Sequence, residues 1–408
     1  MSIKRLLIGQ PIETIKEKRE RLTKLTGLAI FSSDALSSVA YATEEILLAL
    51  IIAGSLLLSY TIPVGMAIAV LIVIVATSYY QIIHAYPTGG GAYIVAKENL
   101  GINAGLVAGA ALLIDYVMTV AVSVTAGIAA ITSAFPYLYE HRVLICIVTI
   151  ILISIANLRG VKESGAVFSI PTYAFVGSFL LLLSIGVTGY FFEPQPYSVP
   201  DIKPPGDFIA LFIILRAFSS GCAALTGIEA VANGVQAFKP PEARNAGIIM
   251  IWLAIILATF FAGITFLSHH FAILPREEET VLSQLAAKVT GKGVLYYIVQ
   301  FSTSLILILA ANTSFAGFPR LASFIANDRY MPRQLSNLGD RLVFSNGIII
   351  LATIASLLII IFQGKTHALI PLYAVGVFLA FTLSQAGMVK ATGLPAESFC
   401  MACNTSFV

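Results

Sequence analysis

Long apolar segments separated by short polar ones recur along almost the whole chain. A helix needs about 20 apolar residues to cross the hydrocarbon core of a bilayer. The pattern therefore predicts ten spans, over about 26–56, 61–84, 103–134, 143–158, 165–192, 208–237, 246–271, 294–326, 343–362 and 368–390. We accordingly divide the chain into a cytoplasmic segment (1–25), a transporter domain of about ten helices (26–390) and a short cytoplasmic tail (391–408).

Composition agrees with this pattern. Of the 408 residues, 58% are hydrophobic and only 11% are charged, whereas a soluble domain carries about 25% charged residues. So much apolar surface exceeds what a single globular core buries. The prediction is an all-α polytopic membrane protein, with the lipid bilayer as its surroundings. A net charge of +3 gives no reason to expect nucleic acid as a partner, and no enzyme or cofactor motif occurs.

Basic residues in the loops set the expected orientation. If the chain starts in the cytoplasm, 17 of the 24 Lys and Arg residues lie inside and six lie outside. The positive-inside rule therefore places both termini in the cytoplasm, in a cell (inner) membrane. A Pro-rich outside segment, 191–207, divides the spans five and five, and Arg276–Glu279 opens a second outside segment with a short surface helix.

Two of the spans carry polar interruptions at corresponding places in these halves. The first span contains Phe31-Ser-Ser-Asp-Ala-Leu-Ser-Ser38, and the sixth contains Phe218-Ser-Ser-Gly-Cys-Ala-Ala-Leu-Thr-Gly227. Small residues can simply allow close helix packing. Paired interruptions, however, are typical of the midplane binding site of a secondary transporter.

Three acidic residues accompany these interruptions: Asp34, Glu229 and, in the third span, Asp115. A carboxylate near the centre of a bilayer costs roughly 2.5–3.5 kcal/mol, so such residues usually face a cavity and mark an ion pathway. Further oxygen-bearing candidates are Thr119 and Ser123 on the face of Asp115, together with Tyr41, Thr226 and Tyr373. This oxygen set suits a monovalent cation and would repel the carboxylate of an amino acid.

Four other polar features have a less specific interpretation. Arg216, in the sixth span, is expected to neutralise a neighbouring acid, and Asn312 to form a hydrogen bond between helices rather than to hold Na⁺. His269-His270 is interpreted as an interface pair rather than a metal site. Glu44 and Glu45 lie one turn beyond Tyr41, but neighbouring side chains on a helix point in different directions, so both cannot face one cavity equally.

Several motifs resemble the amino acid–polyamine–organocation (APC) superfamily. They are Pro87-Thr-Gly-Gly-Gly-Ala-Tyr93, Asn157-Leu-Arg-Gly-Val-Lys-Glu-Ser164, and Gly227-Ile-Glu229 with Lys239-Pro-Pro-Glu-Ala-Arg244. Two more, Ser32-Ser-Asp-Ala-Leu-Ser-Ser-Val-Ala-Tyr-Ala-Thr-Glu-Glu45 and Asp115-Tyr-Val-Met-Thr-Val-Ala-Val-Ser123, are similar to the KimA-type potassium importers of that superfamily.

The resemblance implies the LeuT fold, a 5+5 inverted repeat with broken helices 1 and 6. It implies K⁺/H⁺ symport, with Glu229 as the proton-coupling residue. It implies K⁺ binding near Asp34, Tyr41, Asp115, Tyr116, Thr119, Ser123, Thr226 and Tyr373. Members of that family are longer, with two further helices and a cytosolic domain associated with dimerisation and cyclic di-AMP inhibition. We therefore expect a truncated chain, and the resemblance implies a homodimer as a partner state that the missing domain would support.

The sequence leaves three hypotheses open. The first is a K⁺ importer coupled to H⁺. The second is a proton-coupled amino acid permease of the same fold, in which Asp115 and Glu229 would face the amine of a cationic substrate. The third is a sensor, or a remnant without transport activity.

Overall fold

The structure is a computed structural model that describes residues 21–52, 54–87, 89, 91–159, 165–192, 207–337 and 344–392. The predicted cytoplasmic segment and tail, the Pro-rich outside segment and parts of two superfamily motifs fall largely outside these residues. The described part is helical. Its α-helices are α2 (Lys24–Ile51), α3 (Thr61–Ala85), α4 (Gly91–Leu100), α5 (Ile102–Ala134), α6 (Arg142–Leu158), α7 (Gly165–Phe192), α8 (Asp207–Gly221), α9 (Glu229–Asn233), α10 (Glu242–His270), α11 (Val281–Thr290), α12 (Val294–Asn327), α13 (Ser345–Ile361) and α14 (Thr366–Thr392). Short 3₁₀ segments are η2 (Ser55–Tyr60), η3 (Pro136–His141), η4 (Cys222–Leu225), η5 (Val235–Ala237) and η6 (Arg333–Leu335).

Eight of these helical segments are long and apolar enough to cross a membrane. They are Leu57–Ala85, Ile102–Ala134, Pro136–Leu158, Phe168–Phe192, Ala210–Asn233, Glu242–His270, Val294–Asn327 and Thr366–Ala391. The other two predicted spans are helices as well, but α2 carries several acidic residues and α13 has 17 residues. The chain is a multi-pass membrane protein, and the number ten stays a prediction.

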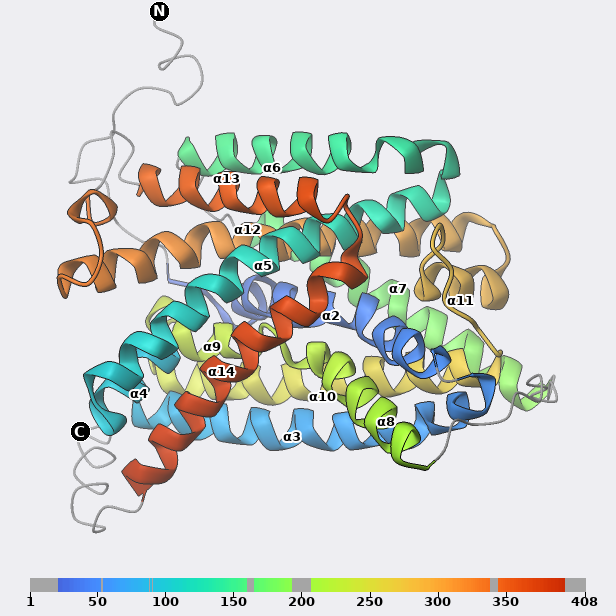
Figure 1. The fold of residues 1–408 in the computed structure, drawn as a ribbon, viewed down its shortest axis with the longest axis horizontal. Helices are drawn as coiled ribbons and strands as arrows, with labels where there is room; N and C mark the ends of the chain where they lie inside the picture. The colour runs from blue at the N-terminus through green and yellow to red at the C-terminus, as the bar shows by residue number, and fades with distance from the viewer. Residues whose placement is uncertain are drawn as a thin grey trace, which may run out of the picture.

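The helices form one elongated bundle with α2 inside it (Figure 1). In this view α6 and α13 lie along one edge and α3 and α10 along the other. Helix α5 packs against α12 and α14, and α2 contacts α7, α8, α10 and α12. Helix α4 lies at the left end of the bundle, and α11, the predicted short surface helix, lies at the right end.

Local sequence explains how α2 begins. Thr23 and Thr26 form a reciprocal cap, since the Thr23 hydroxyl accepts from the Thr26 amide and the Thr26 hydroxyl accepts from the Thr23 amide at 3.0 Å. This cap satisfies two amides that a helix start leaves without partners.

The start of α2 is also fastened to the segment that follows α9. The Leu22 amide donates to the Ala237 carbonyl at 2.8 Å, and the Lys239 amide donates to the Leu22 carbonyl at 3.0 Å. An ion pair of 2.5 Å between Arg21 and Glu242 flanks these bonds. We call these contacts the base clamp.

The predicted break of the first span is not present, because α2 runs as a single α-helix through Ser32-Ser-Asp-Ala-Leu-Ser-Ser38. Three of its four serines form hydrogen bonds within the helix, whereas the Ser32 hydroxyl has no partner among the described residues. Ser33, Ser37 and Ser38 donate to backbone carbonyls three residues earlier, at 2.9, 2.7 and 2.6 Å. Polar side chains satisfied in this way do not require unwound backbone.

Candidate functional site

The sixth span is interrupted as the sequence predicts. Helix α8 passes into η4, Thr226 is extended at ψ 143°, and α9 begins at Glu229. Gly227, between them, has φ +82°, in the left-handed region that favours glycine. A Cβ built on Gly227 would lie 2.6 Å from the Ala35 amide nitrogen and 2.7 Å from Cγ of Asp34. Glycine therefore lets the broken helix approach α2 directly at Asp34.

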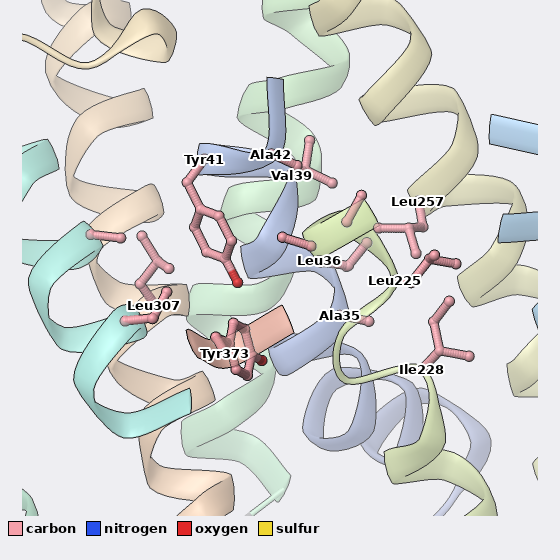
Figure 2. Close-up of a cluster of buried hydrophobic side chains, with 14 of the residues drawn as sticks. Ala35, Leu36, Val39, Tyr41, Ala42, Leu225, Ile228, Leu257, Leu307 and Tyr373 are labelled. Carbon is pink, nitrogen blue, oxygen red and sulfur yellow. The ribbon is translucent and has the colours of Figure 1, made fainter. Parts of the chain in front are cut away.

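A hydrogen bond also holds the broken segment against α2 one turn further along that helix. The Ser38 hydroxyl lies 3.1 Å from the Ala224 carbonyl oxygen in η4. In Figure 2, Ala35 and Leu36 of α2 lie beside Leu225 and Ile228 of the broken segment. Apolar contacts on one side thus hold the polar side chains of α2 in place.

The structure brings together the three acids that the sequence singled out. Asp34, Asp115 and Glu229 are buried, with exposed fractions of 8%, 3% and 6%. The charges of Asp34 and Asp115 each interact with that of Glu229 and with each other. Within the described residues, none of the three forms an ion pair with Lys or Arg.

Hydrogen bonds satisfy these carboxylates only in part. The Glu229 carboxylate accepts from its own amide and from that of Gly227, but its Oε2 has no hydrogen-bond partner among the described residues. The Asp115 carboxylate interacts with the Thr119 hydroxyl, but its Oδ1 accepts no hydrogen bond in the part of the chain that the structure describes. Several carboxylates in an apolar interior are stable only with protons or a cation beside them. The cluster can therefore exchange protons for a cation.

Neutral oxygens lie on one side of this cluster. Thr119 donates to the Tyr373 phenol at 3.1 Å, and the Tyr41 phenol interacts with the Thr226 hydroxyl and with Tyr373. Figure 2 shows the Tyr41 ring extending from α2 toward Tyr373. Ser123 is buried one turn beyond Thr119 on α5. Hydroxyl and phenol oxygens from α2, α5, the break and α14 thus meet beside the three acids.

Tyr116 is placed differently from the other candidates. It is half-buried on α5, and its ring packs against α12, where a Cβ on Gly317 would lie 2.6 Å from its Cε1. No hydrogen bond joins its phenol to the neutral oxygens among the described residues. Its charge environment includes all three acids, so it borders the cluster without joining the hydroxyl group.

Sequence reasoning missed a fourth tyrosine near the acids, in addition to Tyr41, Tyr116 and Tyr373. Tyr79 of α3 is fully buried beside Ser384 of α14, and interacts electrostatically with Glu229 and Asp115. Both residues lie in otherwise regular apolar spans without an interruption. A polar residue at an inward-facing helical position was the only signal, and many such residues merely join helices.

The less specific features have clear positions. Asn157 donates to the Asn312 side-chain oxygen at 2.7 Å, which confirms the interhelical hydrogen bond. Arg216 lies near enough to Glu45 for their charges to attract. His270 packs among Tyr190, Phe266 and Phe271 at the end of α10. No group of three or more metal-ligating side chains occurs among the described residues.

Comparison with known proteins places the chain in a family. A family model described as "Amino acid permease" matches residues 22–392. The chain is 51% identical over 391 residues to "Potassium transporter KimA" of Bacillus subtilis (strain 168), covering 95% of this chain and 64% of that protein. It is 24% identical over 278 residues to "Low-affinity putrescine importer PlaP" of Escherichia coli (strain K12), covering 67% of this chain and 60% of that protein. The chain thus spans less than two thirds of the length of these relatives. The match over nearly all of its described helices shows that the chain belongs to the amino acid permease family.

Proposed function

We propose that the chain is a secondary transporter, not an enzyme, that imports K⁺ together with H⁺. The observation that carries this proposal is the cluster of Asp34, Asp115 and Glu229. These acids are buried beside a group of hydroxyl and phenol oxygens, and none has a basic partner among the residues that the structure describes. Such a set holds a dehydrated monovalent cation by charge and by oxygen coordination. The similarity to a potassium transporter supports the same substrate.

The K⁺ ligands that we propose are the residues expected from the sequence. Asp115, Thr119, Ser123, Tyr41, Thr226 and Tyr373 are the direct candidates, Asp34 borders them, and Tyr116 contributes from the side of α12. Glu229 is proposed to carry the proton. Protonation of Glu229 and occupancy by K⁺ oppose each other electrostatically, which couples the two ions.

Orientation and location are part of the proposal. We infer a cell membrane protein with α4 at the cytoplasmic end of the bundle and α11 at the outer end, as the distribution of basic residues favours. Labelling a single cysteine introduced at the exposed Lys292 from outside intact cells tests this orientation. A homodimer stays a prediction.

The second candidate is a cationic amine as substrate. One of the two relatives, PlaP of Escherichia coli, is a putrescine importer, and three buried acids attract an ammonium group as well as K⁺. An amine also needs a cavity beside the acids that holds its carbon chain. The hydroxyl and phenol oxygens packed around the cluster favour the smaller ion.

Expression of the chain in a strain that lacks its own K⁺ uptake systems, grown at low K⁺, tests the proposal. The parent chain should restore growth and take up ⁸⁶Rb⁺, and Asp115→Asn should abolish uptake while its level in the membrane stays nearly unchanged. Excess putrescine or lysine should not compete. Restored amine uptake without Rb⁺ uptake would favour the second candidate, and near-normal uptake by Asp115→Asn would remove that residue from the site.

A further inference from the structure

A cavity of about 200 Å³ opens at the end of the bundle where α11 lies. Its walls come from α2, α5, the segment before α11 and the start of α14. Tyr41, one of the proposed K⁺ ligands, belongs to its lining. The cavity therefore leads from the expected outer surface to the candidate site.

The lining of this cavity is acidic. It contains five glutamates but only three Lys and Arg residues: Glu44, Glu45, Glu277, Glu278 and Glu279 against Arg142, Arg276 and Lys365. Two of these three basic side chains interact with other groups. Arg142 donates to the carbonyls of Gln363 and Tyr139, and Lys365 lies 3.7 Å from Glu277.

Glu44 and Glu45 both face this cavity, although they are neighbours on α2. Glu44 has a fixed partner, since the first amide of α11, that of Val281, donates to its Oε2 at 3.2 Å. Glu44 thereby occupies the positive end of a helix.

Glu45 is different. Its exposed fraction is 6%, and within the described residues its carboxylate accepts no hydrogen bond and has no direct ion pair. Arg216 attracts it, but Glu44 repels it. Within the described residues, the Glu45 carboxylate therefore has no counter-charge in direct contact with it. A buried carboxylate in that position is stabilised by a cation in the cavity.

Neutral oxygens line the same cavity. The hydroxyls of Thr125 and Thr366 lie 3.1 Å apart, joining α5 to α14, and Thr132 and Thr303 add two more. Hydroxyl oxygens with one carboxylate match the ligand preference of a hard monovalent cation.

We propose that Glu45 and these hydroxyls form an outer cation site, which takes up a monovalent cation of the K⁺ class before it passes to Tyr41. The role of this site in uptake rests on the proposed function, but its binding of a cation does not. It differs from the cluster of Asp34, Asp115 and Glu229 in residues, and lies on the outer side of Tyr41.

Equilibrium binding of ⁸⁶Rb⁺ to the purified full chain in lipid nanodiscs tests the outer site. With the inner site removed by Asp115→Asn, about one Rb⁺ per chain should remain bound. Asp115→Asn combined with Glu45→Gln should bind none, and combined with Glu45→Asp, which keeps the charge, should retain binding. A melting temperature close to that of the parent shows that each variant is folded. Rb⁺ binding that persists in the Glu45→Gln double variant would overturn the proposal.

Uptake at varied outside K⁺ gives the second measurement. Glu45→Gln should raise the half-saturating K⁺ concentration about tenfold, as for loss of one ionic contact, with the maximal rate within about twofold of the parent. Glu278→Gln is the matched control, because it removes the same charge from an exposed position of the same lining, and should change little. Equal shifts in the two variants would mean that the cavity only concentrates cations. A parent that takes up no Rb⁺ would refute the proposed function, and the binding count would still decide the outer site.

Discussion

The hydroxyl of Thr119 on α5 donates a hydrogen bond of 3.1 Å to the phenolic oxygen of Tyr373 on α14. The two residues are 254 positions apart in the sequence and come from opposite halves of the chain. Tyr373 is itself in contact with the Tyr41 phenol of α2. Three helices thus present oxygens at one place, and the geometry of each oxygen depends on the others.

Thr119→Val tests this relationship, because valine keeps the shape of threonine and removes the hydroxyl. We expect a rise of about tenfold in the half-saturating K⁺ concentration for uptake, since loss of one coordinating oxygen and of one hydrogen bond is worth about 1–2 kcal/mol. Thr149→Val on α6 is the matched control, because within the described residues that hydroxyl donates only to the Ile145 carbonyl of its own helix. A Thr119→Val variant with unchanged K⁺ dependence would place the ion elsewhere.

Glu229→Gln mimics the protonated carboxyl group and should uncouple transport from the proton gradient. Flux of K⁺ into proteoliposomes, with and without an inward proton gradient, measures this. The parent should accelerate with the gradient, and Glu229→Gln should not, although it retains K⁺ exchange. Glu98→Gln, at an exposed position on α4, is the control. If Glu229→Gln still responds to the gradient, the proton is carried by another group, with Asp34 the next candidate.

Gly227→Ala should disrupt the contact between the broken segment and α2. Its φ of +82° is strained for alanine, and the added Cβ would lie 2.6 Å from the Ala35 amide nitrogen. We expect the free energy of unfolding to fall by roughly 2 kcal/mol or more, and uptake to be lost. Gly177→Ala on α7 is the control, because no atom of the described residues lies within 4 Å of the Cβ position at Gly177. Thermal unfolding in detergent should show a lower melting temperature for Gly227→Ala but not for Gly177→Ala. Similar melting temperatures for the two variants would contradict the close contact between Gly227 and α2.

Asp328, after the end of α12, should give a pH-dependent contribution to stability. Its carboxylate accepts from Lys97 and Tyr93 of α4, each at 2.6 Å, and these hydrogen bonds lower its pKa. Because the pKa is lower in the folded state, the stabilisation is fully present at pH values above the pKa of the unfolded chain, about 3.9. It is lost as the pH falls through the pKa of the folded chain. Because the pair is partly exposed, Asp328→Asn should cost about 1 kcal/mol or less at pH 7.

Thermal unfolding at pH 7 and at the lowest pH that the folded chain tolerates checks this. The difference between the parent and Asp328→Asn should shrink as the solution is acidified. A difference that grows on acidification would show that Asp328 acts through another contact. Glu98→Gln on the same helix α4 serves again as the control.

The sequence predicted the helices closely because each one coincides with a long apolar segment that polar loop residues bound. The span expected over 103–134 is Ile102–Ala134, and the one expected over 294–326 is Val294–Asn327. The break at Thr226-Gly227 was also readable, because no other residue takes φ +82° so easily.

The sequence did not show whether the first span is a broken or a continuous helix. Serines that unwind a helix and serines that bond back to their own helix have the same sequence pattern, and here Ser33, Ser37 and Ser38 do the latter. Likewise, the sequence pattern does not distinguish Tyr79, which interacts electrostatically with Glu229 and Asp115, from a tyrosine that only joins two helices. Both distinctions depend on which neighbour each side chain meets.

The base clamp ties the beginning of the first span to the end of the sixth. Leu22 is bonded on both sides, to Ala237 and Lys239, and each backbone hydrogen bond contributes about 0.5–1.5 kcal/mol net. Access to the acids from the α4 end therefore cannot come from α2 and α9 parting at this point without losing both bonds. We therefore expect the start of α2 and the segment that follows α9 to move together as one rigid unit relative to the surrounding helices.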